Sequence, residues 1–427
     1  MQTPNANRRT FLFQSAATVA AVASSANIAA NAYAGGSDTL KIGLVGCGGR
    51  GTGAAEQALT ADPGNRLVAM GDAFPDQIES SFSTLKGSAV AERVDVPSDA
   101  RFSGFDAYKN VIDAVDVVLL ATPPGFRPIH FAYAVAKGKH AFIEKPMAVD
   151  GPGLRMFLDA AKESKAKGLA ATHGFCWRYY EPRRELMKRV ADGAIGDITS
   201  VETTYNSRGV WDPRRTREQC SNDMEYQMRN WYYYSWLSGD HIVEQAVHGI
   251  DTMAWALGDA PPTKCWGVGG RQVRTDAKYG NIWDHFSIVY EYPNDVRGYH
   301  QCRHWAETAS QTADFIQGTK GRAEVFNKRI TGANKWRYES AGKPLDMYQS
   351  EHNEMFAAIR AGRPINNAEQ GAYSTLLALM GRMAAYTGEV ITWDKAMNSQ
   401  EALVPKEFAW GDAPHAAIPI PGIHKFA

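Results

Sequence analysis

Lys41-Ile-Gly-Leu-Val-Gly-Cys-Gly-Gly-Arg-Gly-Thr-Gly53 is the stretch of sequence that decides the fold of the first half of this chain. Its apolar run, residues 42–45, predicts a buried strand, and the residues from Ala54 onward predict a helix. Between them stands the pattern Gly46-x-Gly48-x-x-Gly51, with Gly49 and Arg50 inside it. Strand, glycine turn and helix in this order predict a dinucleotide site, because the glycines let a pyrophosphate approach backbone N–H groups. The alternative is a glycine-rich turn that binds nothing.

An acidic residue completes the pattern. The next predicted strand, residues 66–72, ends in Asp72, about 20 residues past the last glycine, where a carboxylate accepts the hydroxyls of the adenosine ribose. The same negative charge would repel a 2′-phosphate. The sequence therefore predicts NAD as cofactor, with NADP the less favoured choice.

Strands and helices alternate from residue 38 to 171, which predicts an α/β Rossmann domain with a doubly wound parallel sheet. Further strands are expected at 115–121, 140–144 and 169–175, and helices at 131–137 and 151–167. Ligands of such sheets bind beyond the carboxyl ends of the strands. The glycine turn, Asp72, residues 122–124 and Glu144-Lys145 all stand at predicted strand ends, so we expect them to share one site.

Residues 172–427 have a different pattern. Period-two alternation at 198–205, 286–292, 296–303 and 323–326 predicts an α+β domain with an open, mostly antiparallel sheet. Helices are expected at 183–192, 351–361 and 370–387. We interpret this part as a substrate-binding and oligomerisation domain.

The first 34 residues read as a targeting signal. Arg8 and Arg9 precede an alanine-rich apolar stretch, and Ala32-Tyr33-Ala34 offers a cleavage site. The segment resembles a bacterial twin-arginine signal peptide, which predicts export to the periplasm. An ordinary secretory signal or a weak membrane anchor is the alternative. No later apolar run is long enough to cross a bilayer, so the mature form is expected away from the membrane.

Charge and cysteine content argue against several other classes of protein. The 427 residues contain 46 Lys and Arg and 46 Asp and Glu. The chain has no basic stripe for a phosphate backbone, so a nucleic-acid partner is not expected. The five cysteines are scattered and form no C-x-x-C pair, so neither a disulfide scaffold nor a zinc site is predicted.

Residues 239–255 predict a helix with acid–base chemistry. His241, Glu244, His248 and Asp251 are spaced three, four and three apart, which places them on one helical face. A solvated polar stripe or buried core histidines would give the same spacing. A metal site would also fit, although the H-E-x-x-H order of zinc proteases is absent. We favour a histidine that titrates near neutral pH beside a carboxylate.

Aromatic residues gather between Tyr226 and Trp236. Trp231 and Tyr233 are candidate platforms for a sugar ring, although packing in the core or in a subunit interface explains them equally well. His285, in Asn281-Ile-Trp-Asp-His285, is a further candidate for contact with substrate. Arg178, just after the last predicted strand of the first domain, is a candidate contact for cofactor or substrate.

Four motifs together resemble the Gfo/Idh/MocA oxidoreductases over nearly the whole mature chain. They are the glycine turn, Thr122-Pro123, Glu144-Lys145-Pro146 and Glu244-x-x-x-His248-x-x-Asp251. The resemblance implies that Lys145 lies at the nicotinamide and assists proton transfer, that His248 is the general base, and that Glu244 is its neighbour. It further implies cofactor contacts at Thr122, Pro123, His130 and Glu144, a substrate contact at Asp251, and a homo-oligomer.

Two departures from the family pattern stand beside the expected site. Family members usually carry Asp where this chain has Glu244, and the loop before His130 is longer here. The resemblance implies oxidation of a sugar or cyclitol hydroxyl, which requires a base and a cation beside the developing oxyanion. Export would keep the cofactor from exchanging, so we expect it to be held tightly and recycled in place. A redox-neutral glycosidase or lyase, and a sugar-binding protein without catalysis, are the alternatives.

Overall fold

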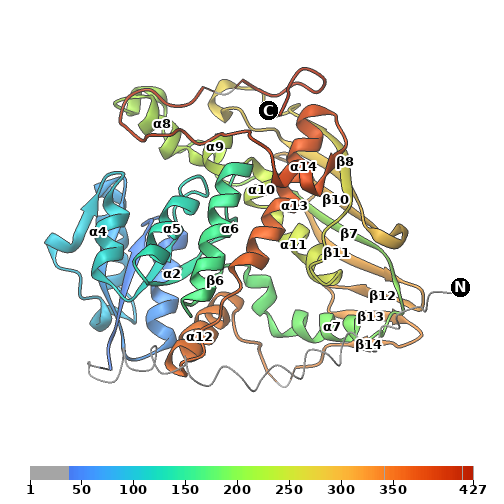
Figure 1. Cartoon of the computed structure of the whole chain (residues 1–427), viewed down its shortest axis with the longest axis horizontal. Helices are drawn as coiled ribbons and strands as arrows, with labels where there is room; N and C mark the ends of the chain where they lie inside the picture. The colour runs from blue at the N-terminus through green and yellow to red at the C-terminus, as the bar shows by residue number, and fades with distance from the viewer. Residues whose placement is uncertain (1–37, 341, 416, 427) are drawn as a thin grey trace, which may run out of the picture.

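The computed structural model describes residues 38–340, 342–415 and 417–426. The predicted signal peptide, residues 1–34, lies outside these ranges. Two sheets organise the described chain, and Figure 1 shows them in two halves that meet along α6 (Gly151–Ala166) and α13 (Ala368–Thr387).

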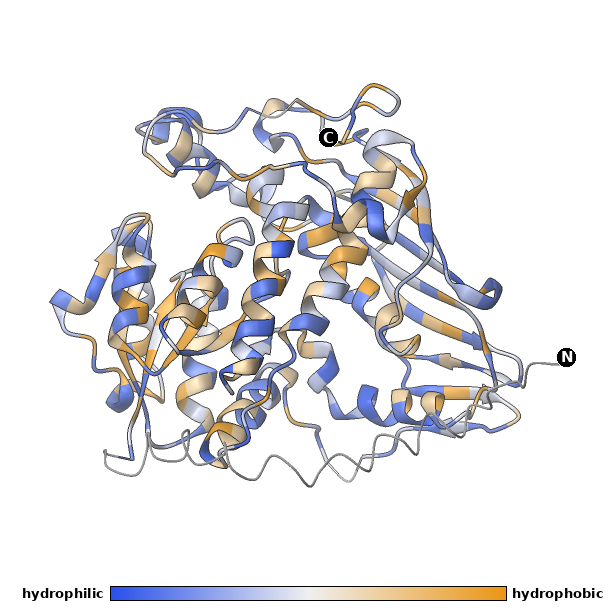
Figure 2. Cartoon of the chain, viewed as in Figure 1, coloured by the Kyte–Doolittle hydropathy of each residue, from blue (hydrophilic) through white to orange (hydrophobic). Residues whose placement is uncertain are grey.

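The first half is a parallel sheet, which confirms the predicted Rossmann fold, and its six strands lie in the order β3-β2-β1-β4-β5-β6. Its strands are buried because helices cover both faces, and Figure 2 shows hydrophobic residues along them. The strands are β1 (Leu40–Val45), β2 (Asn65–Asp72), β3 (Arg101–Ser103), β4 (Val117–Leu120), β5 (His140–Ile143) and β6 (Ala171–His173). The other helices are α2 (Gly49–Ala61), α3 (Pro75–Lys86), α4 (Ala107–Ala114) and α5 (Arg127–Ala136).

The second half contains a nine-stranded sheet in the order β14-β13-β12-β11-β7-β10-β9-β8-β15. Only the central pair, β7 and β10, is parallel among these neighbours, which confirms the mostly antiparallel sheet. The strands are β7 (Ile198–Ser207), β8 (Lys264–Gly270), β9 (His285–Glu291), β10 (Arg297–His304), β11 (Gln311–Gly318), β12 (Gly321–Glu324), β13 (Arg329–Gly332), β14 (Trp336–Arg337) and β15 (Ile391–Thr392).

One face of this second sheet is covered by helices. α13 packs on β8 and β9, and α11 (Val247–Ala256) packs on β7 and β10. Alternate residues of β10 are therefore buried, among them His300, Cys302 and His304, while Tyr299 points outward. Other helices of this half are α7 (Glu181–Ala191), α8 (Asp223–Arg229), α9 (Ser235–Ser238) and α14 (Trp393–Met397).

The single helix predicted over residues 239–255 is wrong. The chain forms α10 (His241–Glu244) and then α11, with a break at Gln245 and Ala246. At the break the N–H of Ala246 donates to the carbonyl of His241, and the Gln245 side chain accepts from Tyr232 Oη at 2.9 Å. The four polar residues do not share one face: Glu244 and His248 line a cavity, whereas His241 and Asp251 are buried away from it.

The C-terminal part of the chain returns to the first half. α12 (Met347–Arg360) packs on α2, as Figure 1 shows near the bottom of the molecule, and Asn366 bridges to Ala171 of β6. Met355, Phe356 and Ile359 belong to the same hydrophobic cluster as Leu40 and Phe142. This helix therefore covers the core of the nucleotide-binding half although it lies far along the sequence.

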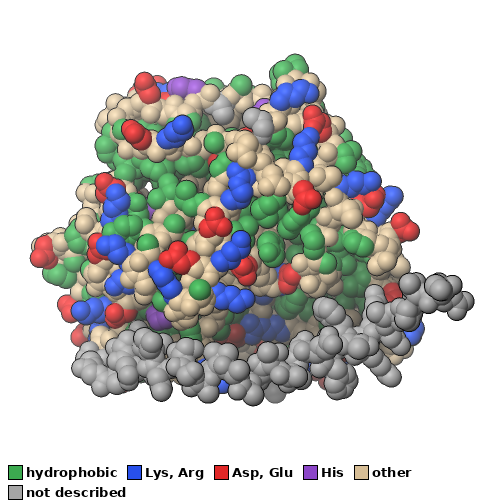
Figure 3. All heavy atoms as spheres, viewed as in Figure 1, with side chains coloured by type: hydrophobic (Ala, Val, Ile, Leu, Met, Phe, Trp, Pro, Cys, Tyr) green, Lys and Arg blue, Asp and Glu red, His purple; other side chains and the backbone are tan. Residues whose placement is uncertain are grey.

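Two further observations concern the surface. In the described part of the chain, we find no helix whose length and apolarity would let it span a membrane. On the face drawn in Figure 3, acidic and basic side chains are interspersed over the helices and do not form one block of either sign.

Candidate active site

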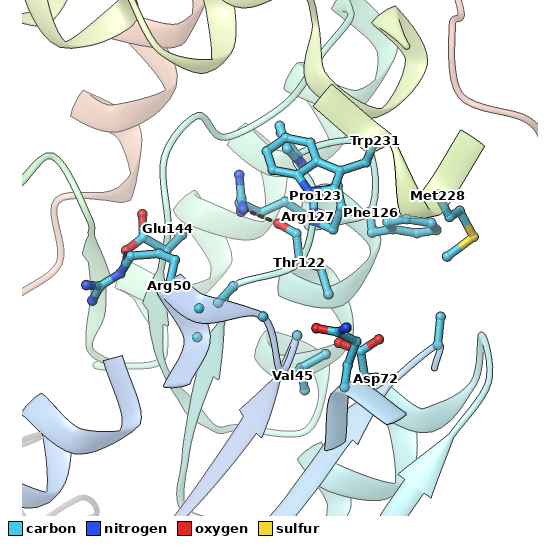
Figure 4. Close-up of a pocket in the computed structure, with 18 of the residues that line it drawn as sticks. Val45, Arg50, Asp72, Thr122, Pro123, Phe126, Arg127, Glu144, Met228 and Trp231 are labelled. Carbon is cyan, nitrogen blue, oxygen red and sulfur yellow. Dashed lines mark hydrogen bonds and ion pairs between the residues drawn. The ribbon is translucent and has the colours of Figure 1, made fainter. Parts of the chain in front are cut away.

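A cavity of about 700 Å³ lies beyond the carboxyl ends of β1, β2, β4 and β5, where the second half of the molecule covers them. Figure 4 shows part of its wall. Most of the predicted site residues meet here: Gly46, Gly48, Gly49, Arg50, Gly51, Asp72, Thr122, Pro123, His130, Glu144, Lys145, Trp231, Glu244 and His248.

The glycines of the turn serve two different purposes. Gly46 has φ +96°, and a Cβ there would lie 2.6 Å from the backbone of Ala121 and Thr122. A Cβ on Gly51 would lie 1.9 Å from the carbonyl oxygen of Gly46. By contrast, a Cβ on Gly48 or Gly49 would meet no atom within 4 Å. The first pair of glycines allows the tight packing, and the second pair leaves an open cradle at the cavity wall.

The start of α2 forms the base of this cradle. Gly48 is the N-cap, no side chain caps the helix, and its first turn contains no acidic residue. The positive end of the helix dipole and its first N–H groups are thus available to an anion. These features fit the pyrophosphate of a dinucleotide.

Asp72 lies at the end of β2 and faces the adjacent part of the cavity (Figure 4). Its carboxylate accepts the N–H of Cys47 at 2.7 Å and that of Phe74 at 3.0 Å. Burial raises the pKa of this carboxyl, while the two backbone N–H groups oppose the shift. The two bonds fix the carboxylate beside the glycine turn, in the position that a ribose-binding acid requires.

A buried arginine, which we did not predict, joins two strand ends. Arg127 is 2% exposed and donates to the carbonyl oxygens of Thr122 and Pro146, which follow β4 and β5. Thr122 Oγ1 lies 3.3 Å from His130 Nδ1. Burial, with Arg127 nearby, lowers the pKa of His130 to about 3, so this ring is neutral. The role of Arg127 depends on carbonyls that only the folded chain brings to it.

Arg50 and Glu144 form an ion pair at the edge of the cradle. Their side chains approach to 2.6 Å, and Figure 4 shows the pair bridging the start of α2 and the end of β5. Glu144 is buried and also accepts the N–H of Lys145 at 3.2 Å. This pair holds the glycine turn against the Glu144-Lys145-Pro146 segment.

Lys145, Glu244 and His248 meet at the junction of the two halves. Lys145 Nζ donates to Glu244 Oε1 at 3.1 Å and to the backbone carbonyl of Glu244. His248 stacks on Trp177, with ring centroids 4.9 Å apart. Burial, and then the charges of Lys145 and Arg183, lower the pKa of His248 well below its ordinary value. The imidazole is therefore neutral near pH 7, and the prediction of a histidine that titrates near neutral pH is wrong, because burial disfavours its charged form.

The structure does not bring Arg178 and Asp251 to the cavity. They pair with each other in the interior, with both Asp251 oxygens 2.9 Å from Arg178 Nε, and Arg178 also bonds Asp259 at 2.6 Å. Ser374 of α13 donates to the same Asp251 carboxylate at 2.7 Å. Their role is to join helices, because two buried charges are tolerated only when they are paired.

Three further residues that we had considered also lie away from the cavity wall. Tyr233 is fully buried, and its hydroxyl donates to the carbonyl of Trp211. His285, at the start of β9, has its Nδ1 2.8 Å from Asp284. His241 stacks on His304 in the core of the second half. Tyr233 and His285 are therefore bound to other residues of the second half, and His241 is packed in its core.

Several cavity residues were not predicted from the sequence. They come mainly from the long connection between β7 and α8 and from α8 itself, and they are Tyr205, Trp211, Arg214, Arg215, Met228 and Arg229. The aromatic and basic composition of this connection was the available signal. It does not by itself show which side chains face the cavity.

The fold and the arrangement of the cavity define a dinucleotide-binding oxidoreductase with a second, sheet-based domain. Residues 40–173 match the oxidoreductase family with an NAD-binding Rossmann fold, GFO/IDH/MocA, and residues 184–324 match the GFO/IDH/MocA C-terminal domain. This chain belongs to the GFO/IDH/MocA oxidoreductase family.

Individual relatives are distant. The inositol 2-dehydrogenase of Burkholderia multivorans is 24% identical over 292 residues, which cover 67% of each chain. The 2,7-anhydro-N-acetylneuraminate hydratase of Escherichia coli is 24% identical over 221 residues, or 51% of this chain and 54% of that protein. The aldose-aldose oxidoreductase of Caulobacter crescentus, solved with glycerol, matches with a TM-score of 0.64 at 19% identity, over 83% of this chain and 99% of that one. The structural match supports the fold.

Proposed function

We propose that this protein is an NAD-dependent oxidoreductase acting on a CH–OH group of a sugar, a sugar derivative or a cyclitol. The observation that carries the proposal is that Lys145, Glu244 and His248 line the same cavity as the glycine turn and Asp72. The inositol 2-dehydrogenase relative supports the substrate class. Asp72 favours NAD over NADP, because a 2′-phosphate would face its carboxylate.

The residues divide the proposed chemistry between them. Bound NAD supplies a hydride acceptor that can also return the hydride. Neutral His248 takes the proton from the substrate hydroxyl, and Lys145 stabilises the developing oxyanion by charge and hydrogen bonding. Glu244 accepts a hydrogen bond from Lys145 and so fixes the ammonium group in the cavity. The cradle at Gly48 and Gly49 takes the pyrophosphate.

We further propose that the cofactor is held tightly and recycled in place. Helix α8 and the C-terminal tail close over the end of the cavity that contains Asp72. Arg229 of α8 forms two bonds of 2.7 and 2.8 Å with Asp76 of α3, and its guanidinium lies over Phe74. This contact ties the second half of the molecule to the nucleotide-binding half.

The C-terminal tail reinforces this closure. It runs along α8 and α9 in Figure 1, and Gly411 accepts the N–H of Met224 at 2.9 Å. Trp410 packs on Phe105, and Phe408 packs on Phe126, with centroids 4.7 and 4.8 Å apart. Phe105 and Phe126 line the cavity, so the tail supports its wall from outside.

Retention fits the proposed export by the twin-arginine route to the periplasm, since that route carries folded proteins with their cofactors. We also propose that two copies associate through the outward face of the nine-stranded sheet. This face carries the exposed residues Val268 and Tyr299. Size-exclusion chromatography with light scattering tests the association.

A redox-neutral reaction is the second candidate. The relative named as a hydratase favours it, because addition of water requires no net oxidation. In this case a transient oxidation would acidify the neighbouring C–H bond, elimination or addition would follow, and the hydride would return. The same three residues would serve both reactions. A sugar-binding protein without catalysis is the remaining alternative.

One experiment separates these functions. The purified protein is denatured, the released nucleotide is identified by absorbance and mass, and the intact protein is offered single sugars, sugar pairs, inositols and aryl glycosides. Turnover of a sugar or inositol with reduction of the nucleotide or of a second sugar supports the first function. Aglycone release or dehydration without net NADH supports the second. Recovery of no nucleotide, together with no binding of added NAD, would overturn both.

A further inference from the structure

Six lysine or arginine side chains line the cavity, and four of them are already engaged. Arg50 pairs with Glu144, Lys145 with Glu244, and Arg229 with Asp76, while Arg127 donates to two backbone carbonyls. The remaining two are Arg214 and Arg215. Within the described ranges, neither of these side chains has an ion pair or a hydrogen bond. Among the described residues, these two cationic side chains of the cavity are therefore the ones without a bonded partner.

The backbone beside these arginines is fixed from within the fold. The Oδ1 atom of Asn230, a fully buried residue, accepts the N–H of Arg214 at 2.6 Å and that of Arg215 at 3.1 Å. Its Nδ2 donates to the carbonyl of Arg215 at 3.0 Å. A buried side chain with three bonds to two adjacent residues holds that backbone in one conformation.

The side chain of Arg214 is also held in place. Its guanidinium carbon lies 4.1 Å from the centroid of Trp211, another cavity residue. The pKa of Arg214 is lowered, mainly by loss of hydration at this wall. Both Arg214 and Arg215 remain exposed. An exposed guanidinium that has no carboxylate beside it forms charge-assisted hydrogen bonds with an anion that enters the cavity.

We propose that Arg214 and Arg215 form a subsite for an acidic group, a carboxylate or a phosphate, on the sugar substrate. Trp211 and Trp231 supply apolar faces for the ring, and Arg214 and Arg215 bind its acidic substituent. The inference rests on the proposed function for its sugar substrate and restricts that substrate to acidic sugars. It assigns specificity to a connection that lies outside both the glycine turn and the Lys145–His248 cluster.

The test uses the nucleotide-loaded protein and calorimetry with three probes: glucose, glucuronate and glucose 6-phosphate. At low salt, at least one acidic sugar should bind about tenfold more tightly than glucose, as expected for a charge-assisted hydrogen bond. A preference for glucuronate assigns a carboxylate, and a preference for glucose 6-phosphate assigns a phosphate. Equal binding of all three, or no binding of the acidic sugars at millimolar concentration, overturns the proposal.

Substitutions of Arg214 and Arg215 test whether these two residues cause the preference for acidic sugars. Arg214→Gln/Arg215→Gln should remove the preference and change glucose affinity by less than about twofold. Arg214→Lys/Arg215→Lys should retain part of it, because the charge remains. Arg363→Gln, at an exposed arginine just after α12, is the matched control and should behave as the unmodified protein. A preference that survives the double glutamine variant would contradict the assignment.

Two further readouts separate this subsite from other roles. If the double glutamine variant weakens NAD binding by the same factor as acidic-sugar binding, the arginines serve the cofactor and the proposal fails. If neutral sugars turn over as well as acidic ones, the proposed function stands and the subsite fails. If acidic sugars bind through the arginines but no hydroxyl is oxidised, the subsite stands and the oxidoreductase function fails.

Discussion

Trp177 and His248 stack on each other at the junction of the two halves, with ring centroids 4.9 Å apart and planes inclined by 23°. The contact determines where the imidazole lies relative to Lys145. Trp177 belongs to the turn after β6, whereas His248 belongs to α11. The position of the proposed base therefore depends on the turn that follows the last strand of the first sheet as well as on α11.

Trp177→Leu should lower kcat by about tenfold, because a displaced base loses the alignment on which proton transfer depends. KM should change little, since Trp177 is not among the cavity residues. Steady-state kinetics measures both values. Trp177→Phe keeps an aromatic face and should recover most of the activity; equal losses in the two variants would contradict a positioning role.

His248→Ala should abolish turnover and leave the bound nucleotide in place. Loss of a general base reduces rates by about 10²–10⁴-fold. Because burial and Lys145 depress the pKa of His248, the pH profile of kcat/KM should show no decline at the usual histidine pKa. Nucleotide content after purification is the control. A variant that arrives without nucleotide would place His248 in cofactor binding instead.

Asp72→Asn should weaken NAD binding by about tenfold, because a charged hydrogen bond to the ribose is lost. It should also reduce the ratio by which the protein prefers NAD to NADP. Equilibrium titration of the nucleotide-free protein with each cofactor measures the two affinities. Asp99→Asn, which removes an exposed charge just before β3, the strand beside β2, controls for a general electrostatic effect. An unchanged ratio of the two affinities would argue against a ribose contact.

Arg229→Gln should accelerate release of the nucleotide, because it removes the two bonds to Asp76 that close the cavity. Displacement of bound NAD by a fluorescent analogue gives the dissociation rate. We expect an increase of about tenfold, with kcat for retained nucleotide nearly unchanged. Arg101→Gln, which breaks the Arg101–Glu79 pair about one turn further along α3, is the matched control. Equal release rates in the two variants would show that α8 does not help to retain the nucleotide.

Because His300 and His304 of β10 are buried, we expect the free energy of unfolding to fall as the pH is lowered. Burial lowers the pKa of each to about 3, whereas the unfolded chain titrates near 6.5. The unfolded state thus binds more protons between about pH 6.5 and 3, and each histidine reduces the free energy of unfolding by about 1.4 kcal/mol per pH unit as the pH falls.

Urea unfolding at pH 7, 6 and 5 measures this dependence. His300→Asn keeps an acceptor for Thr203, which lies 2.8 Å from His300 Nδ1, and removes the titrating group. Its unfolding free energy should decline less steeply below pH 6.5 than that of the unmodified protein. The comparison cancels the contributions of other buried groups. Parallel pH profiles for the two proteins would show that His300 does not carry the effect.

The sequence was most informative where function depends on backbone geometry at strand ends. Gly46, Gly51 and Asp72 could be placed because each follows an apolar strand at a fixed distance. Arg178 and Asp251 could not be placed, because whether an ion pair faces a cavity or joins two helices depends on contacts between distant segments. The break between α10 and α11 was hidden for the same reason: Gln245 bonds to Tyr232, which no local pattern of residues reveals.

The position of α12 has a consequence for synthesis of the protein. Met355, Phe356 and Ile359 complete a cluster that also contains residues of β1 and α2. A nascent chain that ends before residue 347 exposes the apolar face that these three residues cover. The nucleotide-binding half therefore finishes folding only after the ribosome has added almost the entire second half, so a stop codon between the two halves would leave an aggregation-prone fragment.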